Sequence, residues 1–243
     1  MLNQVVRYAA VVGWIEELRG ATLLDVGSGS ESVAGWLGPG WHVTAVDRSF
    51  EDQGAMRGPY GTEPAERLEA DIRRLPLAPR SFDVVLALDL LEHLAPSTRR
   101  SAVDDLVRLA RRRVIVSCPT GGLALAADRR LHDRVVARGL TPPAWLREHV
   151  EHGFPDRGEL HAWLDGYGTL RLFGCEHIRA HESLMRLESR RPGFHASAVA
   201  ARAIARSLRR PRWGRIPGSV AVALARGLDR EPTYRTVAVL DLR

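Results

Sequence analysis

The stretch Leu23–Ser30, which reads Leu-Leu-Asp-Val-Gly-Ser-Gly-Ser, constrains the fold of this chain more than any other. Its first half predicts a short, mainly apolar strand, and Gly27 and Gly29 predict a tight turn into a helix over about 31–37. Glycines at alternate positions lack the side chains that would keep a ligand away from the backbone. The amides of such a turn, together with the N-terminus of the next helix, suit a polar or anionic group. This pattern is typical of the entry to a nucleotide-type pocket in a doubly wound α/β sheet.

A second predicted strand, over 41–47, ends in Asp47, which follows Gly27 by 20 residues. This distance is typical of a carboxylate that hydrogen-bonds a ribose. The alternative is a carboxylate that caps the following segment, and the spacing favours the ribose role.

The rest of the first half alternates strands with helices and loops. We expect a helix over 5–18, a loop or short helix over 51–62, and strands over 67–71, 84–88 and 114–117. A helix capped by Ser97 or Thr98 connects the last two of these strands. This alternation predicts a parallel sheet with right-handed crossovers.

Beyond Gly122 the pattern becomes mostly helical. Helices are expected over 123–139, 159–167 and 179–210, a short helix with an ordered loop over 145–155, and strands over 170–175 and 234–242.

The composition is that of a soluble globular chain. Of its 243 residues, 45% are apolar and 26% are charged, which fits one α/β domain with an elaboration. No apolar run approaches the ~20 residues that span a bilayer. Residues 1–18 lack the apolar core of a signal peptide, so we expect a cytoplasmic protein. Cys118 and Cys175 lie in apolar, strand-like stretches, where buried, inert thiols are expected rather than a disulfide framework or a zinc site.

The net charge of +6 comes from arginine alone, because none of the 35 basic residues is a lysine. Positions 186–215 contain nine arginines and one acid, Glu188. On a helical wheel Arg202, Arg206, Arg209 and Arg210 share one face, which we interpret as the solvated face of a helix. Alternatively, this face binds the phosphates of a nucleic acid or rests on an anionic membrane surface.

Four segments, in this order and at these spacings, resemble the class I S-adenosylmethionine-dependent methyltransferases, in particular the group called methyltransferase type 11. These segments are Leu24–Ser30, Val43–Asp47, Ala70–Leu77 and Ser81–Leu94. The resemblance implies a seven-stranded, mostly parallel sheet with the last strand antiparallel, in a Rossmann-like α/β fold with an inserted helical lid. It also implies one domain over 1–243, with a core over 20–122, helical elaborations over 123–168 and 179–232, and a terminal strand over 234–242.

The resemblance further implies which matched residues bind the cofactor S-adenosyl-L-methionine. They are Asp25, Gly27 and Gly29 at the methionine half, Asp47 at the ribose, Asp71 and Ile72 at the adenine, and Asp89 and Leu90 near the sulfonium. The family often has a third glycine where this chain has Glu31, and we expect that difference to be tolerated.

Methyl transfer from a sulfonium depends mainly on the alignment of donor and acceptor. A hydroxyl acceptor also benefits from a general base. We favour His93 for this role, since it follows a strand at its carboxyl end, and His149 and His152 are the other candidates. We expect no metal here, and we expect Glu92 and His93 to cap the next helix. The alternative is a divalent metal on Asp89, Glu92 and His93, as a similar Glu-x-x-Glu-His pattern provides in some quinone and small-RNA O-methyltransferases of this fold.

The sequence therefore predicts methyl transfer from S-adenosyl-L-methionine to an oxygen or nitrogen of a small-molecule or glycan-type acceptor. An RNA or lipid-linked acceptor and a non-catalytic binding module are the alternatives. A nicotinamide-dependent oxidoreductase is disfavoured, because its fingerprint has a third glycine at the position of Ser32.

Overall fold

The computed structural model describes residues 2–18, 21–29, 32–50, 61–188 and 230–243. The arginine-rich segment lies almost entirely outside these residues, and so do Glu31, most of the expected loop over 51–62 and the end of the helix expected over 179–210. The helices and strands are α1 (Leu2–Glu16), β1 (Thr22–Val26), η1 (Val33–Trp36), β2 (His42–Asp47), β3 (Glu66–Glu69), η2 (Ile72–Arg74), β4 (Phe82–Leu88), η3 (Leu91–His93), α2 (Pro96–Leu109), β5 (Ala110–Pro119), α3 (Gly121–Val136), α4 (Ala144–His152), α5 (Arg157–Leu164), β6 (Gly168–His177), α6 (Ile178–Glu188) and β7 (Thr233–Leu242).

The described strands form one sheet in the order β3-β2-β1-β4-β5-β7-β6. Strands β1 to β5 pair in parallel, and β7 runs antiparallel to both of its neighbours, β5 and β6. The predicted seven-stranded Rossmann-like sheet with an antiparallel last strand is therefore confirmed. The order of the sheet reverses between β1 and β4, which is where open α/β sheets bind ligands.

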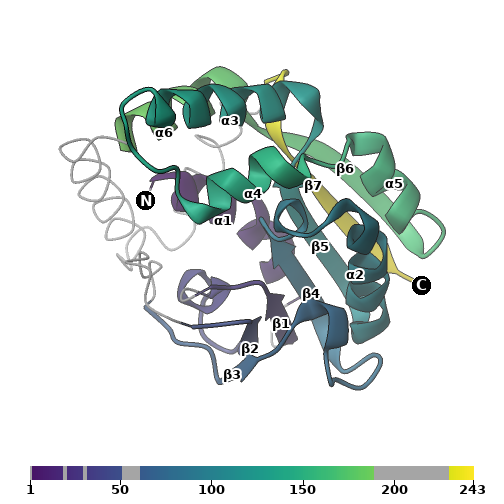
Figure 1. Cartoon of the computed structure of the whole chain (residues 1–243). Coiled ribbons are helices and arrows are strands. Elements are labelled where there is room, and N and C mark those ends of the chain that lie inside the picture. Colours follow the sequence, from purple (N-terminus) through teal and green to yellow (C-terminus); the bar gives the residue numbers. More distant parts are fainter. Residues whose placement is uncertain (1, 19–20, 30–31, 51–60, 189–229) are drawn as a thin grey trace.

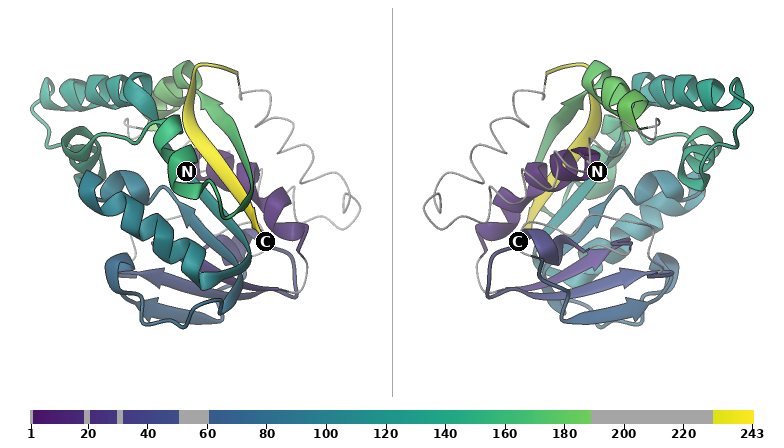
Figure 2. Two further views of the ribbon diagram at one scale, coloured as in Figure 1. Left: turned by 90° about the vertical axis from the view of Figure 1, so that its right-hand side faces the viewer. Right: turned by 90° about the vertical axis from the view of Figure 1, so that its left-hand side faces the viewer.

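Helices cover both faces of the sheet (Figures 1 and 2). Val85 and Ala87 of β4 pack into a core on the side of α2 and α5, whereas Val84, Leu86 and Leu88 pack on the side of α1 and η1. Since successive side chains of a strand point to opposite faces, a strand covered on both faces has an uninterrupted apolar sequence. This explains why β4 lacks the alternation of an exposed strand.

A third group of helices, α3, α4 and α6, packs together (Figure 1), and α4 contacts the η3 turn that follows β4. Helices α3 and α4 of the elaboration expected over 123–168 therefore lie next to the carboxyl end of β4, whereas α5 packs beside α2 on a face of the sheet.

The helix expected over 31–37 is only a short 3₁₀ helix, Val33–Trp36. Ser32 caps it by accepting a hydrogen bond from the amide of Ala34, and Leu37 is already extended. Gly35 inside the turn and the Gly38-Pro39 pair after it both disfavour a longer helix.

The predicted cap of α2 is also wrong. The helix begins at Pro96 after Ala95, and the Thr98 hydroxyl donates to the carbonyl of Ala95. Proline suits the first turn of a helix because the amide it lacks would have no partner inside the helix.

Candidate functional site

The residues predicted to bind the cofactor gather at the carboxyl ends of four adjacent strands. Asp25 lies in β1, Asp47 ends β2, and Asp89 follows β4 directly, while Asp71 follows β3. The parallel pairing sets Asp25 opposite Ala45 on one side and Leu86 on the other. The sheet order thus brings residues from positions 25 to 89 to one edge.

The turn after β1 is held against β2 by its own backbone. The amides of Gly27 and Ser28 both donate to the carbonyl of Val46, at 2.8 and 3.2 Å, and the Gly29 amide donates to Oδ2 of Asp47 at 2.8 Å. Gly27 and Gly29 have φ angles of 73° and 62°, in the left-handed region that favours glycine. Our expectation of amides open to a ligand does not hold for Gly27, Ser28 and Gly29, whose amides are paired within the protein, and the next helix is a single turn.

The carboxylate of Asp25 lies inside this turn. Its Oδ2 accepts hydrogen bonds from the Ser32 hydroxyl at 2.8 Å and the Val33 amide at 2.7 Å, and the side chain is buried. Burial raises the pKa of Asp25 to about 6 even though both hydrogen bonds oppose the rise. Asp25 therefore ties β1 to η1.

Asp47 and Asp71 both lie at strand ends and are partly exposed. Oδ1 of Asp47 accepts from the Ser49 amide at 3.3 Å, so this carboxylate caps the chain after β2 as well as holding the glycine turn. Asp71 caps η2 and binds Arg73, and these hydrogen bonds lower its pKa to about 2. The side chain of Ile72 packs into the core on the side of α2.

Asp89 forms an ion-pair network with two arginines. Its Oδ1 and Oδ2 accept from Nε and Nη2 of Arg235, each at 3.0 Å, and Arg7 of α1 lies 3.4 Å from Oδ2. Arg235 also binds the buried carboxylate of Glu176. Burial alone would raise the pKa of Asp89, but the charges of Arg235 and Arg7 hold it well below its usual value. Asp89 is thus held as an anion at neutral pH.

Leu90 closes the glycine turn from the other side. A Cβ atom on Gly27 would lie 2.9 Å from Cδ1 of Leu90. The glycine at position 27 is therefore needed both for its backbone angle and for this close approach.

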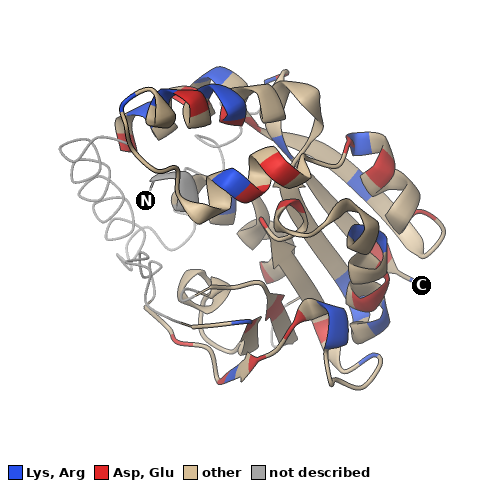
Figure 3. Ribbon diagram, viewed as in Figure 1, with Lys and Arg blue, Asp and Glu red and all other residues tan. Residues whose placement is uncertain are grey.

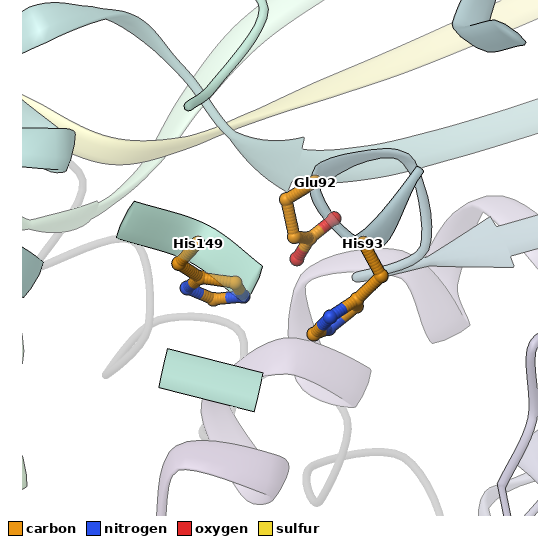
Figure 4. A group of neighbouring side chains, drawn as sticks. All are labelled: Glu92, His93 and His149. Carbon is orange, nitrogen blue, oxygen red and sulfur yellow. The ribbon is translucent and has the colours of Figure 1, made fainter. Parts of the chain in front are cut away.

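A second group of polar side chains combines two residues that follow Asp89 closely, Glu92 and His93, with His149 of α4. One possible ligand atom from each of Glu92, His93 and His149 lies within 4.8 Å of the others. Figure 4 shows the three side chains turned toward a common centre, two from the η3 turn and one from α4. Glu92 is fully buried, and burial raises its pKa well above the usual value. Burial, and then the neighbouring His149, lower the pKa of His93.

Each histidine of this group is oriented by a carboxylate. Nδ1 of His93 lies 2.7 Å from Oε2 of Glu148, and Nδ1 of His149 lies 2.6 Å from Oδ2 of Asp128. The Tyr234 hydroxyl also donates to Oδ2 of Asp128, at 2.9 Å, and Nε2 of His181 lies 3.6 Å from Oδ1 of Asp128. Burial would raise the pKa of Asp128, but its histidine partners lower it to about 2.

Arg99 holds together the two segments that supply this group. Its buried guanidinium donates to the carbonyls of Leu91 and Leu94 around η3, and to those of His152 and Gly153 at the end of α4. The relative position of η3 and α4 is therefore fixed by four hydrogen bonds from one side chain.

Sequence reasoning missed several residues of this region, among them Arg235, Arg7, Asp128 and Arg99. The one available signal was Arg235, a charged residue in the apolar final strand, which suggests a buried partner. The alternative metal site was expected on Asp89, Glu92 and His93. In the structure Asp89 pairs with arginines, and His149 takes its place beside Glu92 and His93.

Comparison with known families identifies the domain built around this edge. Residues 24–137 match the family described as methyltransferase domain. The chain carries a class I, S-adenosylmethionine-dependent methyltransferase domain. The predicted enzyme class and cofactor are thereby confirmed.

Solved methyltransferase structures share the fold of this domain. Magnesium protoporphyrin IX methyltransferase from Synechocystis PCC 6803, with bound S-adenosylhomocysteine, is 22% identical over 72% of this chain and 77% of its own, with a TM-score of 0.52. The plantazolicin methyltransferase BpumL is 10% identical over 99% and 84%, with a TM-score of 0.56. Phosphoethanolamine N-methyltransferase 2 from Haemonchus contortus is 14% identical over 99% and 52%, with a TM-score of 0.54. At such identities the likeness shows the fold alone. A comparison with curated proteins found no match.

Basic and acidic residues alternate along the helices (Figure 3). Arg100 pairs with Asp104 and Arg108 with Asp105 on α2, and Arg130 of α3 pairs with Glu182 of α6. Among the described residues, no helix is long and apolar enough to cross a membrane.

Proposed function

We propose that this methyltransferase transfers the methyl group of S-adenosyl-L-methionine to an oxygen or nitrogen of a small-molecule or glycan-type acceptor. The observation that carries the proposal is the arrangement at the carboxyl ends of β1, β2 and β4. There the glycine turn, Asp47 and Asp89 meet at the point where the sheet order reverses.

In this proposal Asp25, Gly27 and Gly29 lie at the methionine half of the cofactor, and Asp47 binds the ribose hydroxyls. Asp71 and Ile72 lie at the adenine, and Asp89 and Leu90 lie near the sulfonium. Asp47 is partly exposed beside the glycine turn, which supports the ribose role. The aliphatic side chain of Leu90 lies against Gly27, which supports a place beside the methionine half.

We add Arg7 to the proposed cofactor site, as a partner for the carboxylate of the methionine half. Its Nε is buried and has no hydrogen-bond partner among the described residues, although the guanidinium contacts Asp89 and Tyr8. A guanidinium next to the glycine turn suits the carboxylate of the methionine half, because charge-assisted hydrogen bonds to carboxylates are strong.

The chain's contribution to the chemistry is then mainly alignment. A sulfonium is already a good leaving group, and holding donor and acceptor in line supplies roughly 7–11 kcal/mol of barrier lowering. For a hydroxyl acceptor, His93 is the proposed general base, and its burial favours the neutral form that accepts a proton.

Calorimetric titration with S-adenosyl-L-methionine, S-adenosylhomocysteine and NAD tests the proposed cofactor site. We expect the first two to bind and NAD not to bind. Acceptors are then screened by the release of S-adenosylhomocysteine, with hydroxyl and amine compounds tested in parallel. Binding of NAD alone, or turnover with RNA but with no small molecule or glycan, would contradict the proposal.

A further inference from the structure

We infer that Glu92, His93 and His149 form a site for a divalent first-row transition metal, of the Zn²⁺ or Fe²⁺ type. The inference goes beyond the proposed function, because methyl transfer from a sulfonium requires no metal. It also replaces the general-base role proposed for His93, because an imidazole whose Nε2 binds a metal and whose Nδ1 is held by Glu148 has no nitrogen left to accept a proton. It rests on four observations: buried groups without partners, the carboxylates that orient the histidines, the set of donor atoms and the rigidity of the site.

The first observation is that two buried groups are aimed into the cluster without partners. Among the described residues, neither oxygen of Glu92 has a hydrogen-bond partner outside its own residue, and Nε2 of His149 has none. The exposed fraction of the Glu92 side chain is 0%, and that of His149 is 7%. Buried polar groups in proteins are nearly always paired, so an orphaned carboxylate beside an orphaned imidazole nitrogen indicates a bound ligand. A metal cation suits both groups, because the carboxylate and the imidazole nitrogen each offer it a lone pair.

The second observation is the pair of carboxylates behind the histidines. Glu148 holds Nδ1 of His93 and Asp128 holds Nδ1 of His149, which leaves the Nε2 atom of each ring as the metal ligand. Metal-binding histidines almost always give their other ring nitrogen to a carboxylate or carbonyl, which fixes the ring and raises its basicity. Here both histidines have this arrangement.

The third observation is the donor set, two imidazoles and one carboxylate. This set serves catalytic zinc sites and non-haem iron sites, whereas Mg²⁺ and Ca²⁺ prefer oxygen ligands. Ligand atoms of a tetrahedral zinc site lie roughly 3.4 Å apart. The three atoms here lie within 4.8 Å of one another, so small side-chain rotations bring them to a metal.

The fourth observation is the rigidity of the site. Arg99 ties the η3 turn, which carries Glu92 and His93, to the end of α4, which carries His149. Three protein ligands leave at least one coordination position open, as in catalytic metal sites. If the proposed function holds, that position suits an acceptor with a hydroxyl or carboxylate oxygen.

Metal titrations of the whole chain, after treatment with a chelator, test the site. We expect one equivalent of Zn²⁺ to bind by calorimetry, and one equivalent of Co²⁺ to give the visible absorption of a low-coordinate centre. His149→Ala and Glu92→Gln should each weaken binding by at least about 100-fold, and Asp128→Asn by about 10- to 100-fold. His161→Ala is the matched control, because His161 is an exposed histidine on α5, and it should leave metal affinity unchanged.

A measurement on the wild-type protein covers the case in which the variants fail to fold. X-ray absorption of the Zn²⁺-loaded chain should show the outer-shell scattering of two imidazole rings and no sulfur ligand. Failure to bind one equivalent of either metal would overturn the site, and so would a spectrum without imidazole scattering. Titration of the metal-free chain with S-adenosyl-L-methionine separates the two proposals: cofactor binding without any metal affinity removes the metal site alone, and metal affinity without cofactor binding removes the proposed function alone.

Discussion

Arg235 of β7 and Asp89 after β4 form a two-point ion pair, with Nε–Oδ1 and Nη2–Oδ2 distances of 3.0 Å. The two residues are 146 positions apart in the chain, and strand β5 lies between β4 and β7 in the sheet. The pair crosses that strand at the edge where we place the cofactor. The final antiparallel strand therefore contributes directly to the electrostatics of the proposed site.

Loss of Arg235 should destabilise the protein strongly. Arg235→Leu leaves the carboxylates of Asp89 and Glu176 buried near each other without this guanidinium, and breaking a buried pair in this way costs about 3–5 kcal/mol. Urea unfolding measures the change. Arg235→Lys keeps the charge but not the two-point geometry, so it should recover only part of the stability. A Leu variant as stable as the wild type would show that the ion pair contributes nothing.

Gly27→Ala should impair both folding and cofactor binding. The φ angle of 73° costs an alanine about 1–2 kcal/mol, and the added Cβ also displaces Leu90. Gly139→Ala is the matched control, because Gly139 has a φ angle of 69° with open space around its Cβ position. We expect both variants to lose stability in thermal unfolding, but only Gly27→Ala to lose affinity for S-adenosyl-L-methionine. Equal affinities would remove Gly27 and Leu90 from the proposed site.

Asp47→Ala should weaken binding of S-adenosyl-L-methionine by about 10- to 150-fold, since charged hydrogen bonds contribute about 1.5–3 kcal/mol. Asp47→Asn keeps an acceptor for the Gly29 amide, so it separates the loss of the cofactor contact from loosening of the turn. Calorimetry gives both affinities. Unchanged affinity in the Ala variant would mean that another residue binds the ribose.

Asp25 should make the protein less stable as the pH rises. The pKa of its carboxyl is 3.8 in the unfolded reference and about 6 in the folded protein, so the folded state binds the proton more tightly. The stability linked to this proton is fully present below about pH 4 and is lost as the pH rises through about 6, with a total change on the order of 3 kcal/mol.

Asp25→Asn removes this titration. The difference in unfolding free energy, wild type minus variant, should therefore fall between about pH 4 and pH 6, as measured by urea unfolding at several pH values. A difference that is independent of pH over this range would show that Asp25 titrates normally.

Local patterns in the sequence were enough to find the strands and to bring the predicted cofactor residues to one edge of the sheet. The central strands β1, β2 and β4 are short and mainly apolar. The spacing from Gly27 to Asp47 follows from the glycine turn, η1 and β2. Helix ends were predicted less well. The stretch expected to be a helix over 31–37 became the four residues Val33–Trp36, and α2 begins at Pro96 without the predicted cap, because single backbone and capping contacts decide where a helix starts and stops.

The sequence by itself determined the sheet, the glycine turn and the methyltransferase class, because these depend on residues close together in the chain and on a regular alternation of buried segments. Only the tertiary structure decided which charged groups meet. Asp89 was grouped with Glu92 and His93 by spacing, yet its charge is balanced by Arg235 and Arg7, while His149 from α4 completes the group. Burial removes charges from water and makes each depend on a partner nearby in space, and no local pattern identifies that partner.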